Sequence, residues 1–304
     1  MPNILIIGSL NMDMVTVTDT LPRPGETCIG SAFRTIPGGK GANQAAAAAR
    51  LGGSAAMLGC VGADVFGAAL LTNLERFGVD VSAVRKHADA ATGVAAITVS
   101  GGDNSIIVVP GANSALSPRD MEAAQALFAW ADTIVLQLEI PMDTVRSAVR
   151  LGKKHKKTVI LNPAPAAALN ADVLSHVDIL TPNESEAECL TGLPVTSVKQ
   201  AITAALHLAA VVPEVVITLG ANGAVWAHGA SAAHFPAYKV AAVDSTAAGD
   251  TFTGALAVRL AMGDPMPEAI SYAQGASALA VQRLGAQDSI PTAAEAEQFL
   301  QKTP

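Results

Sequence analysis

Two turns in the sequence each run directly into a helical segment, and both contain residues that suit the binding of an anion. The first is GGKGANQ at residues 38–44, and the second is DSTAAGDT at residues 244–251. Unpaired N–H groups and the helix dipole at a helix N-terminus favour a negatively charged ligand. In the second turn, Asp250 could accept a proton from a hydroxyl while these N–H groups stabilise a transferring phosphoryl group. The simpler alternative, favoured by this turn alone, is an aspartate that only caps its helix.

The first turn fails the tests for two common nucleotide-binding motifs. A Walker A motif needs Ser or Thr after its lysine to hold magnesium, but Gly41 follows Lys40. A dinucleotide fingerprint needs a third glycine where this chain has Gln44. What remains is a flexible turn where backbone N–H groups and Asn43 can approach a ligand, or else a plain loop before a helix.

Short apolar runs alternate with helical segments along most of the chain. Continuous apolar runs are typical of strands buried on both faces of a parallel sheet. They predict strands at residues 4–7, 55–58, 133–138, 158–161, 178–180 and 215–219. Helices are expected at residues 41–51, 65–77, 118–130, 141–155, 198–210, 249–262, 267–283 and 292–300. This order predicts an α/β fold with a mostly parallel central sheet that is covered by helices on both faces.

Two segments, residues 13–36 and 92–110, break this alternation. No helix follows either one, and a glycine-rich turn lies at residues 101–104, so we expect antiparallel strands joined by turns. They would form a small separate sheet that serves as a lid over the site or pairs with another subunit. Because no linker is evident, residues 1–304 are predicted to form a single domain.

The composition indicates a compact globular protein and leaves small ligands open. Of its 304 residues, 50% are hydrophobic and 15% charged, and the formal net charge of −7 argues against nucleic-acid binding through phosphate contacts. The longest apolar stretch beyond the N-terminal region, residues 201–212, is too short to span a bilayer, so no membrane association is expected. Three widely spaced cysteines indicate neither a disulfide framework nor a zinc site. A cytoplasmic location is therefore expected.

Taken together, the two turns resemble the two signature regions of the ribokinase-like (PfkB) family of sugar kinases. Further matching motifs lie along the whole chain, at residues 8–14 (GSLNMDM), 137–141 (QLEIP), 161–166 (LNPAPA), 181–192 (TPNESEAECLTG), 217–224 (ITLGANGA) and 285–291 (GAQDSIP). Within the family the likeness is strongest to the ribokinase group, which commonly has alanine at the position of Ala247 where many other members have glycine. The resemblance implies the ribokinase-like fold.

The resemblance also implies an ATP-dependent kinase that phosphorylates the O5 hydroxyl of D-ribose. Asp250 would be the general base, and the backbone amides of Ala247, Ala248, Gly249 and Asp250 would form an anion hole. Amide and carboxylate side chains suit a sugar because each can pair with two hydroxyls. The implied sugar-binding residues are Asn11, Asp13, Gly39, Lys40, Gly41, Asn43, Glu139 and Asp250.

Contacts with ATP and metal ions are implied at further positions. For ATP they are Asn183, Thr218, Leu219, Gly220, Ala221, Asn222, Gly223, Ala248, Gly249 and Gln274. Asn183 and Glu186 match the N-x-x-E motif of the family, one helical turn apart on the same face, which is associated with magnesium and phosphate positioning. An activating potassium ion would be held next to the anion hole by Asp244, Thr246, Ala280, Arg283, Gly285 and Ser289. The family likeness and the strand pattern together imply a homodimer in which the small sheets of two subunits cross.

Two alternatives remain open. The same chemistry could act on another acceptor, such as deoxyribose, fructose, a keto-deoxy sugar acid or a nucleoside. With only 4% aromatic residues, the chain offers few platforms for stacking a nucleoside base. A protein of another class, a sugar-binding regulator that keeps the fold without transferring phosphate, is disfavoured by the presence of Asp250, Asn183 and Glu186.

Overall fold

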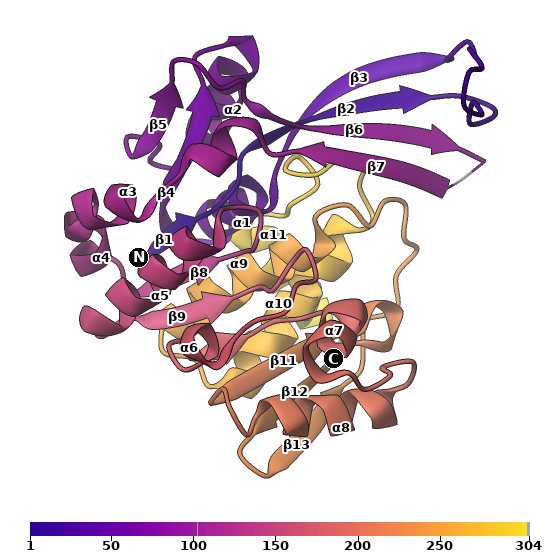
Figure 1. Ribbon diagram of the computed structural model, residues 1–304. Coiled ribbons are helices and arrows are strands. Elements are labelled where there is room, and N and C mark those ends of the chain that lie inside the picture. Colours follow the sequence, from indigo (N-terminus) through magenta and orange to yellow (C-terminus); the bar gives the residue numbers. More distant parts are fainter. Residues whose placement is uncertain (102, 303–304) are drawn as a thin grey trace.

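The centre of the protein is a nine-stranded sheet, seen in a computed structural model that describes residues 1–101 and 103–302 (Figure 1). Its strands are β1 (Asn3–Ile7), β4 (Ser54–Gly62), β5 (Val84–His87), β8 (Thr133–Leu136), β9 (Thr158–Leu161), β10 (Ile179–Leu180), β11 (Glu214–Thr218), β12 (Ala224–His228) and β13 (Ser231–Phe235). They lie in the order β13-β12-β11-β10-β9-β8-β1-β4-β5. Neighbours from β5 to β11 are parallel, whereas β12 and β13 extend one edge in antiparallel orientation. The predicted mostly parallel sheet is thereby confirmed.

Helices cover both faces of this sheet because its central strands are apolar on both sides. In β1, Ile4 and Ile6 pack into one apolar cluster, and Leu5 and Ile7 pack into another. The first cluster includes residues of α1 (Lys40–Arg50), α2 (Val65–Arg76), α9 (Ala248–Ala261), α10 (Met266–Ala280) and α11 (Ala293–Lys302). The second includes residues of α3 (Pro118–Ala123), α4 (Gln125–Trp130), α5 (Met142–Lys154), α6 (Ala171–Leu174), α7 (Glu184–Thr191) and α8 (Val198–Leu208).

Some predicted elements differ from the structure. The helix expected at residues 118–130 is two helices, because the chain leaves helical geometry at Ala124, with φ −93° and ψ 16°. The strand expected at residues 133–138 ends at Leu136. Strands β5, β12 and β13 were not predicted; β13, for example, is an edge strand with mostly exposed side chains and has no continuous apolar run.

A separate four-stranded sheet projects from the body of the protein (Figure 1). It contains β2 (Asn11–Val17), β3 (Ala32–Gly38), β6 (Gly93–Ser100) and β7 (Asp103–Val109) in the order β3-β2-β6-β7. The predicted antiparallel pairs are present as β2–β3 and β6–β7. The two pairs are joined by a parallel pairing of β2 with β6, which the sequence did not indicate. Of the predicted turn at residues 101–104, Gly102 lies outside the described residues.

The base of the small sheet meets the first strand and the first helix of the body. Asn11 at the start of β2 pairs with Gly38 at the end of β3, and α1 begins at Lys40. Gly39 has a φ of 93°, and a Cβ atom there would lie 2.6 Å from the backbone nitrogen of Asn11. Glycine is therefore required at position 39, where the first turn (residues 38–44) passes the start of β2.

The far part of the small sheet exposes apolar side chains on both faces. In β7, Ile106 is 53% and Ile107 is 68% exposed, and successive residues of a strand point to opposite faces. Because β7 is also an edge strand, its unpaired backbone groups and its apolar side chains are both open to another surface. The small sheet therefore has apolar surface and an unpaired edge that a second subunit could cover, or that could fold over a bound ligand.

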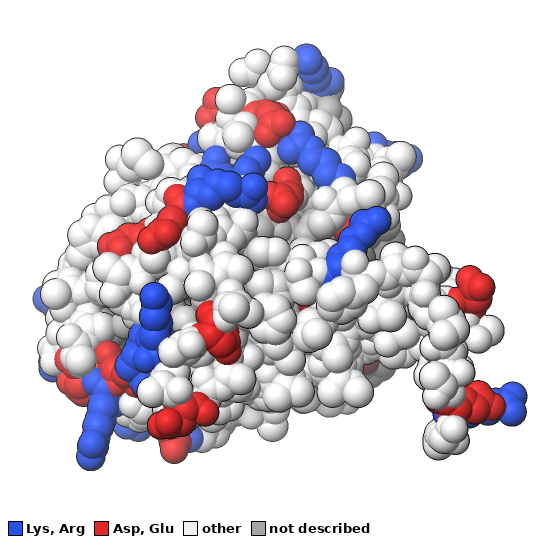
Figure 2. Space-filling model, turned by 90° about the horizontal axis from the view of Figure 1, so that it is seen from above, with Lys and Arg blue, Asp and Glu red and all other residues white. Residues whose placement is uncertain are grey.

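Charged side chains of both signs lie in several groups on one face of the protein (Figure 2). On the face drawn in Figure 2, lysine and arginine alternate with aspartate and glutamate among uncharged residues, and no continuous basic field is present. This face therefore gives no support for recognition of a nucleic-acid backbone. Among residues 1–101 and 103–302, no helix combines the length and apolar character needed to cross a bilayer.

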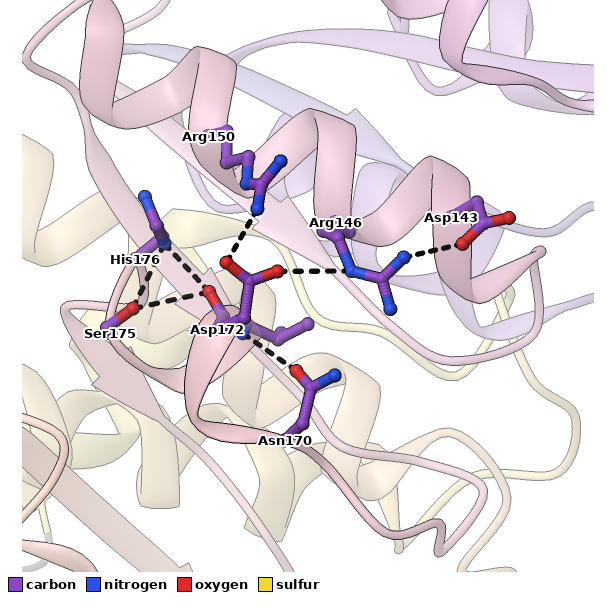
Figure 3. A network of polar contacts seen from close by, with 8 residues as sticks. Asp143, Arg146, Arg150, Asn170, Asp172, Ser175 and His176 are labelled. Carbon is purple, nitrogen blue, oxygen red and sulfur yellow. Dashed lines mark hydrogen bonds and ion pairs between the residues drawn. The ribbon is translucent and has the colours of Figure 1, made fainter.

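A network of ion pairs joins α5 to α6 (Figure 3). Asp172 accepts from Arg150 Nη2 at 2.7 Å and lies 3.2 Å from Arg146 Nε, and Arg146 also pairs with Asp143 at 2.6 Å. The hydrogen bond from Arg150 holds the pKa of Asp172 below its usual value. Because these charges satisfy one another at the surface, we assign the network to the docking of α6 rather than to ligand binding.

Candidate active site

Asp250 lies in the first turn of α9, where it is 7% exposed and its carboxylate is held by two amide side chains. Gln44 Nε2 donates to Asp250 Oδ1 at 2.9 Å, and Asn43 Nδ2 donates to Asp250 Oδ2 at 2.9 Å. Both donors lie near the start of α1 and are the last two residues of the GGKGANQ segment. The two glycine-containing turns therefore meet at this carboxylate, although 206 residues separate Gln44 from Asp250.

The start of α9 presents free backbone donors beside this carboxylate. Ala247 precedes the helix in left-handed geometry, with φ 59°, and the Ala248 amide donates to the Ser245 carbonyl at 3.2 Å. Within the described parts of the chain, the amides of Gly249 and Asp250 have no hydrogen-bond partner. A Cβ atom at Gly249 would meet nothing within 4 Å, and residues 247–250 line a cavity of about 210 Å³. An anion can approach them there.

A second group of polar side chains gathers around Glu139. Its Oε2 accepts from Ser9 Oγ at 2.5 Å, from the Lys40 backbone amide at 3.2 Å and from Asn11 Nδ2 at 3.4 Å. Asn113 Nδ2 holds the Asn11 side-chain oxygen at 2.8 Å, which fixes the orientation of that amide. The end of β1, the start of β2 and the start of α1 thus supply one polar cluster.

The carboxyl groups of Asp13, Glu139 and Asp250 lie close enough to influence one another. Burial raises the pKa of Asp13 to about 7, and the carboxylates of Glu139 and Asp250 add to the shift. Burial lowers the pKa of Lys40, but the carboxylates of Asp250 and Glu139 outweigh burial and hold that pKa above its usual value. Lys40 is therefore a firmly charged ammonium among carboxylates, suited to hydroxyl groups or to phosphate oxygens.

Two adjoining cavities open at the N-terminus of α9. The smaller, about 210 Å³, is lined by Lys40, Asn162, Thr181, Asn183, Glu186, Thr218, Ser245, Ala247, Ala248, Gly249, Asp250 and Thr253. The larger, about 470 Å³, shares Thr218, Ser245, Ala248 and Gly249 with it and continues along Tyr238, Val240, Phe252 and Val281. A polar cavity that joins a more apolar one suits a ligand with a phosphate chain and an aromatic base.

Asn183 and Glu186 form a capping box at the start of α7. Asn183 Oδ1 accepts from the Glu186 amide at 2.9 Å, and Glu186 Oε2 accepts from the Asn183 amide at 2.8 Å. Asn183 is the N-cap residue just outside the helix rather than part of its first turn, but its side chain lies beside that of Glu186, with Nδ2 donating to Oε1 at 3.0 Å. Burial raises the pKa of Glu186, although the hydrogen bond from the Asn183 backbone opposes the shift.

The sequence pattern of the pfkB family of carbohydrate kinases matches residues 1–293. The chain belongs to this family. A ribokinase of Bacillus subtilis is 41% identical over 300 residues, covering 99% of this chain and 100% of the relative. A deoxyribokinase of Salmonella typhi is 38% identical over 301 residues, covering 98% of both chains.

A solved structure supports the fold of this pfkB kinase. The ribokinase of Arabidopsis thaliana, solved in complex with ribose and ATP, superposes with a TM-score of 0.92 at 32% sequence identity. The match covers 99% of this chain and 98% of the other. The ribokinase-like α/β fold expected from the sequence is thereby confirmed.

Most of the residues expected to bind ATP line the larger cavity, but Leu219 and Asn222 make other contacts. Of the expected nucleotide-binding segment, Thr218, Gly220, Ala221 and Gly223 line the larger cavity, and so does Gln274. By contrast, the side chain of Leu219 is buried in an apolar cluster. The carbonyl of Asn222 is engaged by His234 at 2.7 Å.

The segments expected to hold a monovalent cation also lie side by side in this pfkB kinase. Asp244 accepts from the Thr246 amide at 2.9 Å and from the Gly285 amide at 3.0 Å. Burial raises the pKa of Asp244, but hydrogen bonding to the side chain and amide of Thr246 and to the Gly285 amide outweighs burial and holds the pKa below its usual value. The side chain of Arg283 points instead to Glu295, at 2.7 Å, and Ser289 Oγ donates to the Ala286 carbonyl at 2.7 Å.

Several residues of the site were not predicted from the sequence. Gln44, Ser9 and Asn113 each donate to a group at the centre of the site, and residues 237–240 and Ala242 line the larger cavity. Gln44 and Ser9 stand next to predicted residues within matching motifs, which was the available signal. Asn113 and the cavity residues 237–240 and 242 belong to no matching motif. Their places in the site depend on how distant segments fold together.

The raised pKa of Asp13 predicts a pH-dependent stability. Between about pH 4 and pH 7, the folded pfkB kinase retains a proton at Asp13 that the unfolded chain has released, so the stability contributed by Asp13 falls as the pH rises. We expect Asp13→Asn to raise the free energy of unfolding at pH 8 by on the order of 1–3 kcal/mol, and hardly at pH 4. Urea denaturation at both pH values measures this difference.

The control for this prediction is Asp19→Asn, which changes an exposed aspartate for which no side-chain hydrogen bond is found in the described chain. It should leave the free energy of unfolding unchanged at both pH values. An equal effect of Asp13→Asn at pH 4 and pH 8 would contradict the raised pKa.

Proposed function

We propose that this chain is an ATP-dependent ribokinase that phosphorylates the O5 hydroxyl of D-ribose. The observation that carries the proposal is the position of Asp250, between the polar cluster around Glu139 and the free amides at the start of α9. The relatives named above support it, because one is a ribokinase and another was solved with ribose and ATP. Asn11, Asp13, Lys40, Asn43 and Glu139 would bind the sugar, together with the turn at Gly39 and Gly41.

In this proposal, Asp250 accepts the proton of the acceptor hydroxyl while that oxygen attacks the γ-phosphorus of ATP. The new O–P bond forms as the bond from the γ-phosphorus to the bridging oxygen breaks, and ADP leaves with that oxygen. The amides of Gly249 and Asp250 would donate to the phosphoryl oxygens, and Lys40 would add positive charge from the same cavity. Catalysis would then rest on positioning and electrostatic stabilisation.

The nucleotide would occupy the two adjoining cavities, with its base in the larger one beside Tyr238 and its phosphates in the smaller one. Magnesium neutralises phosphate oxygens when it is bound. The described residues contain no group of three or more His, Cys, Asp or Glu side chains that could hold a metal. Magnesium would therefore be held largely by the phosphates, with Asn183 and Glu186 at the edge of the cavity.

A potassium ion would bind beside the anion hole in this proposal. Monovalent cations are held by carboxylate and carbonyl oxygens, and Asp244 supplies a carboxylate that its hydrogen bonds to Thr246 and Gly285 keep charged. Carbonyls near Ala280, Arg283 and Ser289 would complete the set. Activity assays with and without potassium, at constant ionic strength, test this assignment.

An ADP-release assay over a panel of acceptors tests the proposed function. We expect the largest kcat/KM on D-ribose, and less on 2-deoxyribose, fructose, keto-deoxy sugar acids and nucleosides. The main second candidate is a deoxyribokinase, favoured by the 38% identity to the Salmonella typhi enzyme. Faster turnover of 2-deoxyribose would establish that candidate, and absence of turnover on every acceptor would favour a sugar-binding regulator.

The small sheet would act as a lid and as the contact between two subunits. Its exposed apolar strand β7 and its unpaired edges support a homodimer in which two such sheets cross. Sedimentation velocity tests the dimer, and Ile107→Asp should shift a dimer toward monomer. The single-domain organisation and the cytoplasmic location stay predictions.

A further inference from the structure

Two chains of buried amide side chains end on the two oxygens of Asp250. The shorter chain runs from Gln137 Nε2 to Gln44 Oε1, at 2.6 Å, and from Gln44 Nε2 to Asp250 Oδ1, at 2.9 Å. Gln44 Nε2 also donates to Asn162 Oδ1 at 3.2 Å. The side-chain amide of Gln44 is therefore used on both its donor and its acceptor side.

The longer chain reaches Asp250 from the surface. Arg76 donates to Asn73 Oδ1 at 2.9 Å, and Asn73 Nδ2 donates to Gln287 Oε1 at 2.6 Å. Gln287 Nε2 then donates to Asn43 Oδ1 at 3.1 Å, and Asn43 Nδ2 donates to Asp250 Oδ2 at 2.9 Å. It joins an exposed guanidinium on α2 to the buried carboxylate.

The direction of both chains follows from the chemistry of their ends. An ionised carboxylate can only accept hydrogen bonds, so Asn43 and Gln44 must turn their NH₂ groups toward Asp250. Their carbonyl oxygens then point away and require a donor, which Gln287 and Gln137 supply. Each amide fixes the orientation of the next.

Burial restricts the inner members of both chains. Gln44 and Gln137 are fully buried and Gln287 is 2% exposed, so water cannot replace a lost partner. A rotation of Asp250 about its side-chain bonds would leave at least one buried amide donor unpaired, which is costly. The carboxylate is therefore held in one orientation while its remaining lone pairs stay available to a substrate hydroxyl.

We propose that Gln44 and Gln287 are positioning residues that act on phosphoryl transfer through Asp250. The inference rests on the proposed function, in which Asp250 is the base. Gln44 is fully buried, and Gln287 is separated from Asp250 by Asn43. Their effect would therefore appear in the chemical step rather than in nucleotide binding.

The test replaces each glutamine by methionine, which has a similar length but no amide. We expect kcat on D-ribose to fall about 10- to 100-fold in Gln44→Met and by a smaller factor in Gln287→Met, because a misplaced base loses its alignment with the hydroxyl. The KM for ATP should stay within about threefold of the wild-type value. Thermal denaturation of each variant establishes that the measured protein is folded.

Combination with Asp250→Asn separates positioning from a general loss of structure. If the glutamines act through the Asp250 carboxylate, adding Gln44→Met or Gln287→Met to Asp250→Asn should change kcat by less than about twofold. The matched control is Thr144→Val, which removes a fully buried hydrogen bond, from Thr144 Oγ1 to the Leu116 carbonyl at 2.8 Å, away from Asp250. Its kcat should remain within about twofold of wild type.

The possible outcomes separate this inference from the proposed function. A folded Gln44→Met protein with wild-type kcat would overturn the positioning role, as would an equal loss of kcat in the wild-type and Asp250→Asn backgrounds. If Gln44→Met does not fold, Gln287→Met decides by the same two criteria. A wild-type protein without turnover on any acceptor would overturn the proposed function and this inference together, whereas active wild type with unaffected variants overturns this inference alone.

Discussion

Replacement of Asp250 by asparagine is expected to lower kcat by about 10²- to 10⁴-fold, because the variant has no carboxylate to accept the proton of the acceptor hydroxyl. Sugar binding should persist, since the polar cluster around Glu139 is unchanged. ADP release measures kcat, and isothermal titration calorimetry measures sugar binding.

The matched control for this prediction is Asp143→Asn, which alters an exposed aspartate of the surface network on α5 and should keep kcat within about twofold. A near-normal rate in Asp250→Asn would remove Asp250 from the role of base. Loss of sugar binding together with kcat would indicate a binding residue instead.

The second large effect is expected on folding, from Gly41→Ala. A Cβ atom at Gly41 would lie 2.7 Å from the Ser9 nitrogen and 2.8 Å from the Gly8 carbonyl carbon, and these are backbone atoms at the end of β1. Because neither atom can rotate away, α1 would have to move off the strand end. We expect a loss of about 3 kcal/mol or more in the free energy of unfolding, measured by urea denaturation.

Gly249→Ala is the matched control for stability, because a Cβ atom at Gly249 would meet nothing within 4 Å. Its free energy of unfolding should stay within about 0.5 kcal/mol of wild type. Equal losses in Gly41→Ala and Gly249→Ala would contradict the assignment of the cost to the close approach of α1 to β1.

The sequence was sufficient to predict the layered fold, because continuous apolar runs such as residues 4–7 can only be buried on both sides. It also indicated the two turns that meet at Asp250, since each combines small residues with a polar group at a helix start. The small sheet was expected from the turn residues and the missing helices, but the parallel pairing of β2 with β6 was not. In the sequence, β2 and β6 are separated by three strands and the helices α1 and α2, so no local pattern indicates that they pair.

What could not be predicted depends on contacts between distant parts of the chain. Gln287 and Asn43 are 244 residues apart, and no local pattern of residues marks their hydrogen bond. The larger cavity is lined in part by residues 237–240 and Ala242, which form no regular element and have no chemical signature. The spacing of Asn183 and Glu186 predicted neighbouring side chains but not the capping box, because spacing alone does not locate the first residue of a helix.

The direction of the amide chains limits how the specificity of this protein can be redesigned. A side chain at position 287 must donate to Asn43 and accept from Asn73 at the same time, which excludes apolar, acidic and cationic replacements. An engineer who changes Asn43 to fit a new acceptor must therefore choose residue 287 together with it. Libraries that vary the sugar pocket one position at a time would miss the active combinations.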